Sequence, residues 1–149
     1  MGQKIVYTYD TGGNITSKKI YAYTNGTVGS LIDTINYTYN TTWKDKLASY
    51  DGQTITYDSI GNPKTYRDGM SFTWNGRQMK TANLNGTSVT YKYNADGQRT
   101  YKKVGSTVHE YEYSNGRLFT VNRYRYFDGR SDLLYAVHNS RGDVVALYN

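Results

Sequence analysis

Cysteine is absent from the 149-residue sequence, and Pro63 is its only proline. Without cysteine the chain forms no disulfide and offers no thiolate to a metal ion. Export from a bacterial cell is compatible with this composition, although many cytosolic chains share it. Apolar runs reach only about five residues, as in Leu133 to Val137, whereas a membrane-spanning helix needs roughly 20. The sequence therefore predicts no membrane span, and its first residues lack the apolar stretch of a signal peptide.

Aliphatic residues that could fill a helical core are also scarce. Apolar residue types make up only 37% of the chain, yet 18 residues are Tyr and 15 are Gly. Aromatic side chains favour strands because they cover a pleated, half-buried surface. Glycine supplies the positive φ that tight hairpin turns require. We therefore expect an all-β fold with many turns.

Acidic residues are outnumbered, with 12 Asp and Glu against 18 Lys and Arg and a net charge of +6. This balance favours polyanionic partners such as nucleic acid, acidic glycan or cell-wall polymer. The basic residues are dispersed, however, and Lys18-Lys19 and Lys102-Lys103 are their densest pairs. Dispersed charge is typical of a solvated surface, which is the interpretation we favour.

One strand-like pattern recurs along the chain. Apolar or aromatic residues alternate with polar residues in Ile5–Tyr9, Ile35–Tyr39, Ile55–Tyr57, Phe72–Trp74, Val89–Tyr93 and Tyr111–Tyr113. From Tyr39 onward the last aromatics stand at 39, 57, 74, 93 and 113, which are 18, 17, 19 and 20 residues apart. The first interval, from 9 to 39, is 30 residues and indicates one unit with an insertion near 21–32. This self-similarity indicates a repeat architecture.

Glycine turns are expected at both ends of these strands. The turns are 10–14, 58–62, Asn75-Gly76, 94–97 and Asn115-Gly116 at one end, and Asn25-Gly26, Asp51-Gly52, Asp68-Gly69, Asn85-Gly86 and Gly105-Ser106 at the other. Asn-Gly and Asp-Gly are strong hairpin signals, because type I′ turns need positive φ at both central positions. Together they predict a continuous antiparallel meander. In 40–47, Trp43 and Leu47 stand four residues apart, so a short helical turn is expected to replace the glycine loop there.

The strand period places alternate tyrosines on one face of the sheet. Such tyrosines usually form cross-strand pairs that stabilise the sheet, which is the interpretation we favour. Beside basic residues they could instead stack on sugars or unpaired bases, but no basic stripe points to a specific nucleic-acid partner. The candidate ligand face is Tyr7, Tyr37, Tyr91, Tyr111, Arg77 and Arg117.

In these motifs the chain resembles the RHS, or YD-repeat, family, whose repeat carries a Tyr-Asp pair followed by a Gly-centred turn. The motif residues, expected to have structural roles, are Tyr9, Asp10, Gly13, Tyr39, Tyr57, Asp58, Gly61, Trp74, Gly76, Tyr93, Gly97, Tyr113 and Gly116. The string from Trp43 to Pro63 resembles RHS arrays of Gram-positive bacteria, including wall-associated proteins. The end of the chain, near 131–149, resembles the start of the RHS-associated core.

The resemblance implies a curved or spiralling sheet, a fragment of a hollow shell that in the family encloses a C-terminal toxin released by self-cleavage. Residues 1–149 would form a single β domain of about six repeats. Its expected partners are the remaining repeats and the C-terminal core or toxin of a parent protein. That parent would be secreted or lie on the cell surface of a Gram-positive bacterium.

Residues with catalytic or metal-binding chemistry are sparse. The two histidines, His109 and His138, have no metal-ligand spacing. Ser140, His138 and Asp143 lack the context of a nucleophile elbow. The recurrent aspartates are Asp10, Asp58, Asp96 and Asp128. We expect them to form turns rather than the paired carboxylates of a glycosidase, and expect no enzyme activity, metal or cofactor.

Two functions remain open. The first is a non-catalytic structural segment of an RHS-type shell. The alternative is a carbohydrate-binding adhesin module of the cell surface, with the same fold and a ligand on one face. In either case the unpaired edges of an isolated meander invite pairing with another chain, so we expect an edge-strand dimer.

Overall fold

The computed structural model describes residues 2–149, and this part of the chain contains strands and turns but no helix. The strands are β1 (Gly2–Tyr9), β2 (Ile15–Thr24), β3 (Thr27–Tyr39), β4 (Leu47–Tyr50), β5 (Gln53–Thr54), β6 (Ser71–Asn75), β7 (Gln78–Leu84), β8 (Thr87–Tyr93), β9 (Arg99–Val104), β10 (Thr107–Ser114), β11 (Arg117–Arg125), β12 (Arg130–His138) and β13 (Val144–Tyr148). Within each sheet every strand pairs antiparallel with its neighbours in sequence. The predicted all-β antiparallel meander is confirmed.

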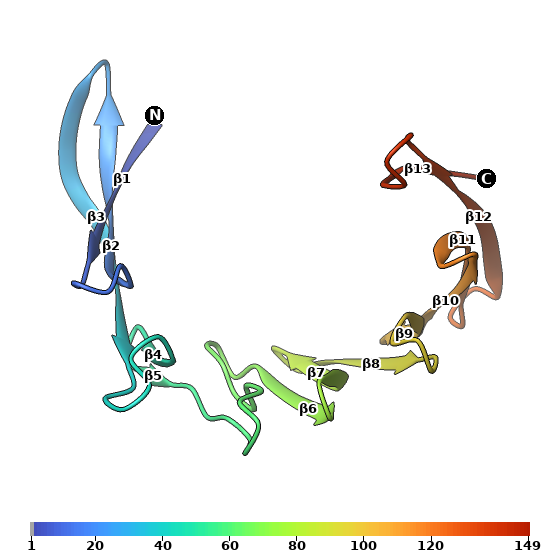
Figure 1. Ribbon diagram of the computed structural model, residues 1–149. Coiled ribbons are helices and arrows are strands. Elements are labelled where there is room, and N and C mark those ends of the chain that lie inside the picture. Colours follow the sequence, from blue (N-terminus) through green and yellow to red (C-terminus); the bar gives the residue numbers. More distant parts are fainter. Residues whose placement is uncertain (1) are drawn as a thin grey trace. The chain divides into compact units, whose positions relative to one another are not determined.

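The chain divides into two compact units, one ending at Asp68 and the other spanning Gly69–Asn149. The first unit holds the five-stranded sheet β1 to β5, and the second holds the eight-stranded sheet β6 to β13 (Figure 1). Each unit therefore consists of one sheet. A single domain over 1–149 stays a prediction, and its first residue lies outside the described range.

Within each unit no second layer of secondary structure from residues 2–149 covers the sheet, so little apolar surface is enclosed. Among the described residues the buried apolar side chains are few: Ile55, Ala82, Val89, Val108 and Val121. Cross-strand pairs and hydrogen bonds must therefore contribute much of the stability that a core would otherwise supply.

Five of the expected turns have positive φ at both central residues. They are Asn25-Gly26, Asp51-Gly52, Asp68-Gly69, Asn85-Gly86 and Asn115-Gly116, with φ of 47–58° at Asn or Asp and 71–83° at Gly. These values are those of a type I′ turn. The Asn25-Gly26 turn joins β2 to β3, so the expected insertion near 21–32 is a lengthened hairpin.

Two hairpins are built differently. β6 ends at Asn75 and β7 begins at Gln78, so the loop is Gly76-Arg77 rather than the expected Asn75-Gly76. Gly76 and Gly105 have φ of 56° and 54° at the first central position, and their successors have no positive φ. Glycine at that position is the mark of a type II′ turn.

The helical turn expected in 40–47 is wrong. The Asn40 side-chain oxygen accepts hydrogen bonds from the backbone N–H groups of Thr42 (2.9 Å) and Trp43 (2.8 Å). Lys46 N–H then donates to the Trp43 carbonyl at 2.9 Å. The Asn side chain takes up the amides in a local turn, an alternative that competes with helix formation.

The strand expected at Ile55–Tyr57 is also absent. β5 ends at Thr54, and Tyr57 forms only an isolated bridge with Pro63. Backbone hydrogen bonds flank this bridge, from Asp58 N–H to the Asn62 carbonyl and from Lys64 N–H to the Thr56 carbonyl. The Thr56 N–H, however, donates to the Thr65 hydroxyl at 2.9 Å instead of to a ladder carbonyl, so no regular strand forms. Ile55 is nevertheless buried, with 6% of its surface exposed.

Replacing Gly86 with Ala should destabilise the second unit. A Cβ at Gly86 meets no atom within 4 Å, so the cost arises from its φ of +83°, a left-handed conformation that costs an L-residue about 1–2 kcal/mol. Urea denaturation followed by circular dichroism measures the loss. The control Asn85→Gly relieves the adjacent positive φ of 52° and should leave the midpoint nearly unchanged. Equal losses in both variants would contradict the assignment of a type I′ turn.

Candidate functional site

Four loops of the form Asp/Asn-x-x-Gly-x share one hydrogen-bond pattern. In the first, Asp10 Oδ1 accepts from the N–H groups of Gly12 and Asn14, both at 2.9 Å, and Asp10 Oδ2 accepts from Asn14 Nδ2 at 3.0 Å. The backbone of Asp10 donates to the Asn14 carbonyl and accepts from Gly13 N–H. One side chain therefore closes the loop and holds the two strands in register.

The same pattern recurs in the other three loops. They begin at Asp58, Asn94 and Asn139 and end at Asn62, Gln98 and Asp143. Each first residue accepts from the backbone N–H of the last residue at 2.8–3.0 Å. Gly13, Gly61 and Gly97 have φ of 87°, 88° and 80° at the fourth position, so the glycine is required by the backbone conformation.

Two positions differ from what the sequence pattern indicated. Asp96 occupies the third position of its loop, and Asn94 takes the role that Asp10 has in the first loop. The segment at the C-terminal end, expected to resemble the RHS-associated core, forms a further loop of the same kind around Asn139 and Gly142. The spacing between Asn139, Gly142 and Asp143 was the signal that could have identified it.

Hydrogen bonding holds the pKa of two loop carboxylates low. The pKa of Asp10 is lowered chiefly by the side chain of Asn14 and then by backbone N–H groups. For Asp58, burial raises the pKa, but hydrogen bonds from Asn62, Ile60 and Gly61 outweigh it and the net pKa is lowered. Both loops are therefore most stable with the carboxylate ionised.

At six turns the strand register shifts at the last or next-to-last residue of the strand that enters the turn. These residues are Tyr9, Tyr39, Trp74, Tyr93, Tyr113 and His138. In each case the returning strand carries one extra residue, as in a β-bulge. For example, Tyr93 pairs with Arg99 while Lys92 pairs with Tyr101. The bulge therefore recurs with the repeat.

Tyrosine hydroxyls link one repeat to the loop before it. Tyr39 donates to the Ile15 carbonyl at 2.9 Å, immediately after the Asp10 loop. Tyr57 donates to the Leu47 carbonyl at 2.7 Å after the 40–46 loop, and Tyr113 donates to the Arg99 carbonyl at 2.9 Å after the Asn94 loop. Burial raises the pKa of Tyr39 and of Tyr57, which keeps these hydroxyls protonated as donors.

Loop side chains also contact the next loop along the sheet. Asn14 Nδ2 donates to the Lys44 carbonyl at 3.3 Å, and Gln98 Nε2 donates to the Gly116 carbonyl at 2.9 Å. Trp43 lies over Gly61, where an added Cβ would be 3.7 Å from the indole. The loops therefore contact one another along the edge of the array.

The six residues of the candidate ligand face are divided between the two units. Tyr7 is 42% exposed, and Tyr37 packs edge-on against Tyr50 at 5.3 Å. In the second unit Tyr91 and Tyr111 flank one guanidinium, which belongs to Arg99. Sequence analysis had not selected Arg99, although its place directly after the Asn94 loop was visible.

The two arginines of the candidate ligand face lie at turns. Arg77 is an exposed residue of the Gly76-Arg77 loop. Arg117 lies beside Gly142, where an added Cβ would be 3.3 Å from the guanidinium carbon. Neither arginine is among the residues that contact the rings of Tyr91 and Tyr111.

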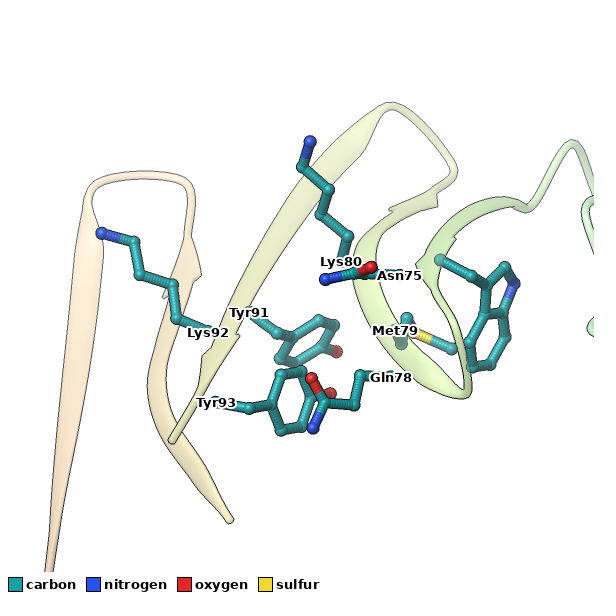
Figure 2. Close-up of a pocket in the computed structure, with 8 residues that line it drawn as sticks. Asn75, Gln78, Met79, Lys80, Tyr91, Lys92 and Tyr93 are labelled. Atoms are coloured by element: carbon teal, nitrogen blue, oxygen red, sulfur yellow. The ribbon is translucent and has the colours of Figure 1, made fainter. Parts of the chain in front are cut away.

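A pocket of about 360 Å³ opens on the second unit between β6, β7 and β8. Its lining comprises Trp74, Asn75, Gln78, Met79, Tyr91 and Tyr93, with Lys80 and Lys92 at its border. Figure 2 shows the rings of Tyr91 and Tyr93 beside the Gln78 side chain, while the amino groups of Lys80 and Lys92 point away from these rings. The arrangement offers aromatic surface together with amide groups.

Residues 2–149 contain no group of three or more His, Cys, Asp or Glu side chains that could hold a metal ion. Over the same residues no helix is long and apolar enough to cross a membrane. Asp143 Oδ2 accepts from Asn139 Nδ2 at 2.9 Å as part of the loop. The Asp143 carboxylate therefore contacts residues of its own turn, Asn139 and Arg141.

No family model matches the chain. The tRNA3(Ser)-specific nuclease WapA of Bacillus spizizenii is 27% identical over 168 aligned residues, which cover 98% of this chain and 7% of WapA. The Tc holotoxin pore of Photorhabdus luminescens with a mutated TccC3 matches 92% of this chain with 19% identity and a TM-score of 0.48. The TcdB2–TccC3–TEV crystal structure matches 97% with 17% identity and a TM-score of 0.47. This chain spans 7% of each of these structures.

The likeness to WapA covers nearly every repeat, and the same loop recurs along the chain. The chain therefore resembles one stretch of WapA along nearly its whole length. In this chain the Asp of the Tyr-Asp pair closes the loop, and Tyr39 and Tyr57 bind the loop before their own.

Exchanging Asp10 and Asp58 for Asn should reduce the sensitivity of the chain to acid denaturation. Asn keeps the acceptor oxygen, as Asn94 and Asn139 do naturally. Because the folded pKa of each Asp lies below its ordinary value, its stabilisation is present above about pH 4 and is lost as the pH falls. Urea midpoints measured from neutral to acid pH should therefore fall less in the double variant. Asp96→Asn is the control, and an equal effect there would contradict the role of the loop carboxylates.

Tyr57→Phe should lower the free energy of unfolding by about 1 kcal/mol, because the Leu47 carbonyl loses its hydroxyl donor. Chemical denaturation measures the change. Tyr9→Phe is the matched control, since Tyr9 is 59% exposed, and it should cost almost nothing. An equal loss of unfolding free energy in both variants would show that the hydrogen bond from the Tyr57 hydroxyl to the Leu47 carbonyl does not stabilise the fold specifically.

Proposed function

We propose that this chain is an RHS-type repeat segment, a non-catalytic structural stretch of a larger bacterial toxin-related protein, in which its sheets form part of the wall of a shell around a C-terminal toxin. The observation that carries the proposal is the repeated loop and its tyrosine link, exemplified by Asp10 with Tyr39 and by Asn94 with Tyr113. Hydrogen bonds of this kind extend a sheet one repeat at a time. The motif residues therefore stabilise the backbone of the loops, which is a structural role and not a catalytic one.

The share of WapA that the chain matches also supports a structural role. WapA is named as a tRNA3(Ser)-specific nuclease, and the chain corresponds to 7% of it. We assign such nuclease activity to another part of proteins of this kind. The partners of this segment would then be further RHS repeats and the C-terminal toxin of the same protein.

The proposed location is the cell surface or the medium of a Gram-positive bacterium, and the Bacillus source of WapA supports it. A wall segment in such a place needs to remain folded without reducing conditions or cofactors. The absence of cysteine from the sequence is compatible with that setting.

A carbohydrate-binding adhesin module is the second candidate. The pocket around Trp74 and Tyr93 favours it, because aromatic rings and side-chain amides line the same opening. The two functions share one fold and are compatible in one molecule.

The edges of the sheets provide the test of the structural proposal. On β13, Val145 and Tyr148 expose 61% and 70% of their surface, and on β1, Ile5 exposes 44%. Unpaired edges of this kind recruit further strands. We therefore expect concentration-dependent self-association by analytical ultracentrifugation, with cross-links between copies at the edge strands β1, β5, β6 and β13.

Val145→Lys should weaken this association, because charge on an edge strand opposes pairing. Asp96→Asn, which lies in a loop, is the control and should associate as the unchanged chain does. A chain that stays strictly monomeric at high concentration would count against edge pairing. Cleavage of tRNA by the purified 149-residue chain would overturn the non-catalytic role.

A further inference from the structure

A row of charged and aromatic side chains crosses the second unit on one face of its sheet. Directly opposite residues link Tyr91 on β8 to Lys102 on β9, Lys102 to His109 on β10, His109 to Arg123 on β11, and Arg123 to Asp132 on β12. Residues directly opposite on adjacent strands lie on the same face. Neighbouring strands are about 4.8 Å apart, so the row is continuous.

The carboxylate at the end of the row neutralises only one of its cations. Arg123 donates to Asp132 at 2.6 and 3.0 Å, and the pKa of Asp132 is lowered chiefly by that hydrogen bond. Among the ion pairs of residues 2–149, none includes Lys102 or Arg99. Positive charge therefore remains in the middle of the row.

Arg99 lies on this face beside the row. Its guanidinium carbon is 5.7 Å from the ring centre of Tyr91 and 4.9 Å from that of Tyr111. The rings orient the guanidinium while their faces supply negative potential. An arginine held between two rings is positioned in advance for a carboxylate, which it can bind through two parallel hydrogen bonds.

The pKa of His109 reflects the burial of its ring and the positive charges that surround it. Its pKa is lowered first by burial and then by the positive charges of Lys102, Arg123 and Arg99. Its Nδ1 atom is buried and has no hydrogen-bond partner. The ring lies nearly parallel to Tyr111, with 6.5 Å between ring centres. The His109 ring thus brings an unpaired polar atom close to the positive charges of Lys102 and Arg99.

The row adjoins the pocket described above, because Tyr91 belongs to both. On one side Tyr91 lines the pocket with Trp74, Tyr93 and Gln78. On the other side it contacts Arg99 and pairs with Lys102. The aromatic and amide-lined pocket therefore lies next to a cationic patch formed by Arg99 and Lys102.

We propose that this face of the second unit binds an acidic polysaccharide, with a sugar ring in the pocket against Trp74 and Tyr93 and a neighbouring uronate carboxylate on Arg99 and Lys102. Sugars present apolar ring faces and hydroxyl groups, which suit aromatic rings and side-chain amides. Their carboxylates complement the two cations that lack an ion pair. This inference rests on the carbohydrate-binding function proposed above and does not depend on a role in a shell wall.

The geometry favours a sugar over single-stranded nucleic acid. Base stacking uses successive open aromatic faces along a positive groove. Here Tyr91 and Tyr111 both contact the Arg99 guanidinium, and Asp132 closes the row of charges. The patch is short and bounded, which suits a few carboxylates better than a continuous line of phosphates.

The sequence offers a local reporter for this site. Its two tryptophans are Trp43 and Trp74, and Trp74 lines the pocket. Trp43→Phe in the full chain therefore leaves Trp74 as the sole tryptophan. We would titrate this variant with an oligogalacturonate and follow its fluorescence, using a neutral oligosaccharide, a glycerol-phosphate polymer and single-stranded oligo(dT) as comparisons.

The expected result is saturable binding of the oligogalacturonate with a change in Trp74 fluorescence, and weaker binding of the three comparison ligands. Arg99→Gln and Lys102→Gln in the same background should each weaken binding roughly tenfold, because a charge-assisted hydrogen bond is lost. Arg141→Gln is the matched control, since it removes one positive charge from a side chain that is 85% exposed, and should bind as before. Urea midpoints identify any variant that fails to fold, and either cation variant suffices for the comparison.

Several results would overturn the proposal. They are no fluorescence change with the oligogalacturonate, equal weakening by Arg141→Gln, or equal binding of the neutral oligosaccharide. Tighter binding of the glycerol-phosphate polymer would assign the patch to phosphate instead of uronate. Tighter binding of oligo(dT) would assign it to nucleic acid.

Discussion

A side-chain oxygen held against backbone amides at the end of a hairpin is the interaction on which this array depends. Asp10, Asp58, Asn94 and Asn139 each supply it. It fixes the position at which the chain reverses and so fixes the register of the strands that follow. A slip of one residue would turn every side chain of a strand to the opposite face. The loop therefore decides which residues face each side of the sheet.

Few other interactions in the molecule could fix the register of the strands. In a globular protein a packed core selects the register, because only one arrangement buries the apolar side chains. Here few apolar residues are buried, and each unit consists of one sheet. Local hydrogen bonds and neighbouring aromatic contacts replace the core. Such contacts join adjacent repeats only, which makes stability a sum of repeat and interface contributions.

The sequence was sufficient for the strand class, the antiparallel order and the type I′ turns, because these follow from alternation and from Asn-Gly or Asp-Gly pairs. It failed where a side chain competed with the backbone. The Asn40 side chain accepts from the amides that were expected to enter a helical turn, and the Thr65 hydroxyl accepts from the Thr56 N–H that a strand at Ile55–Tyr57 would have given to a partner strand. The Gly76 turn was displaced by one residue, because glycine is compatible with either central position of a hairpin turn.

The candidate ligand face was harder to foresee than the fold. Alternation places Tyr91 and Tyr111 on one face of the sheet, but it does not show which basic residue lies beside them. Arg77 and Arg117 were selected from the motif, whereas the guanidinium between the rings belongs to Arg99. Its position results from the bulge that pairs Tyr93 with Arg99, and a bulge shifts register by an amount that the sequence period does not encode.

The tyrosine link has a consequence for how such arrays change in length. Tyr39, Tyr57 and Tyr113 each bind the backbone carbonyl of the residue that follows the preceding loop. A carbonyl is present whatever side chain stands at that position, as Ile15, Leu47 and Arg99 illustrate. The joint between two repeats thus requires no matched pair of side chains. A repeat can be duplicated or lost while its new neighbours still fit together.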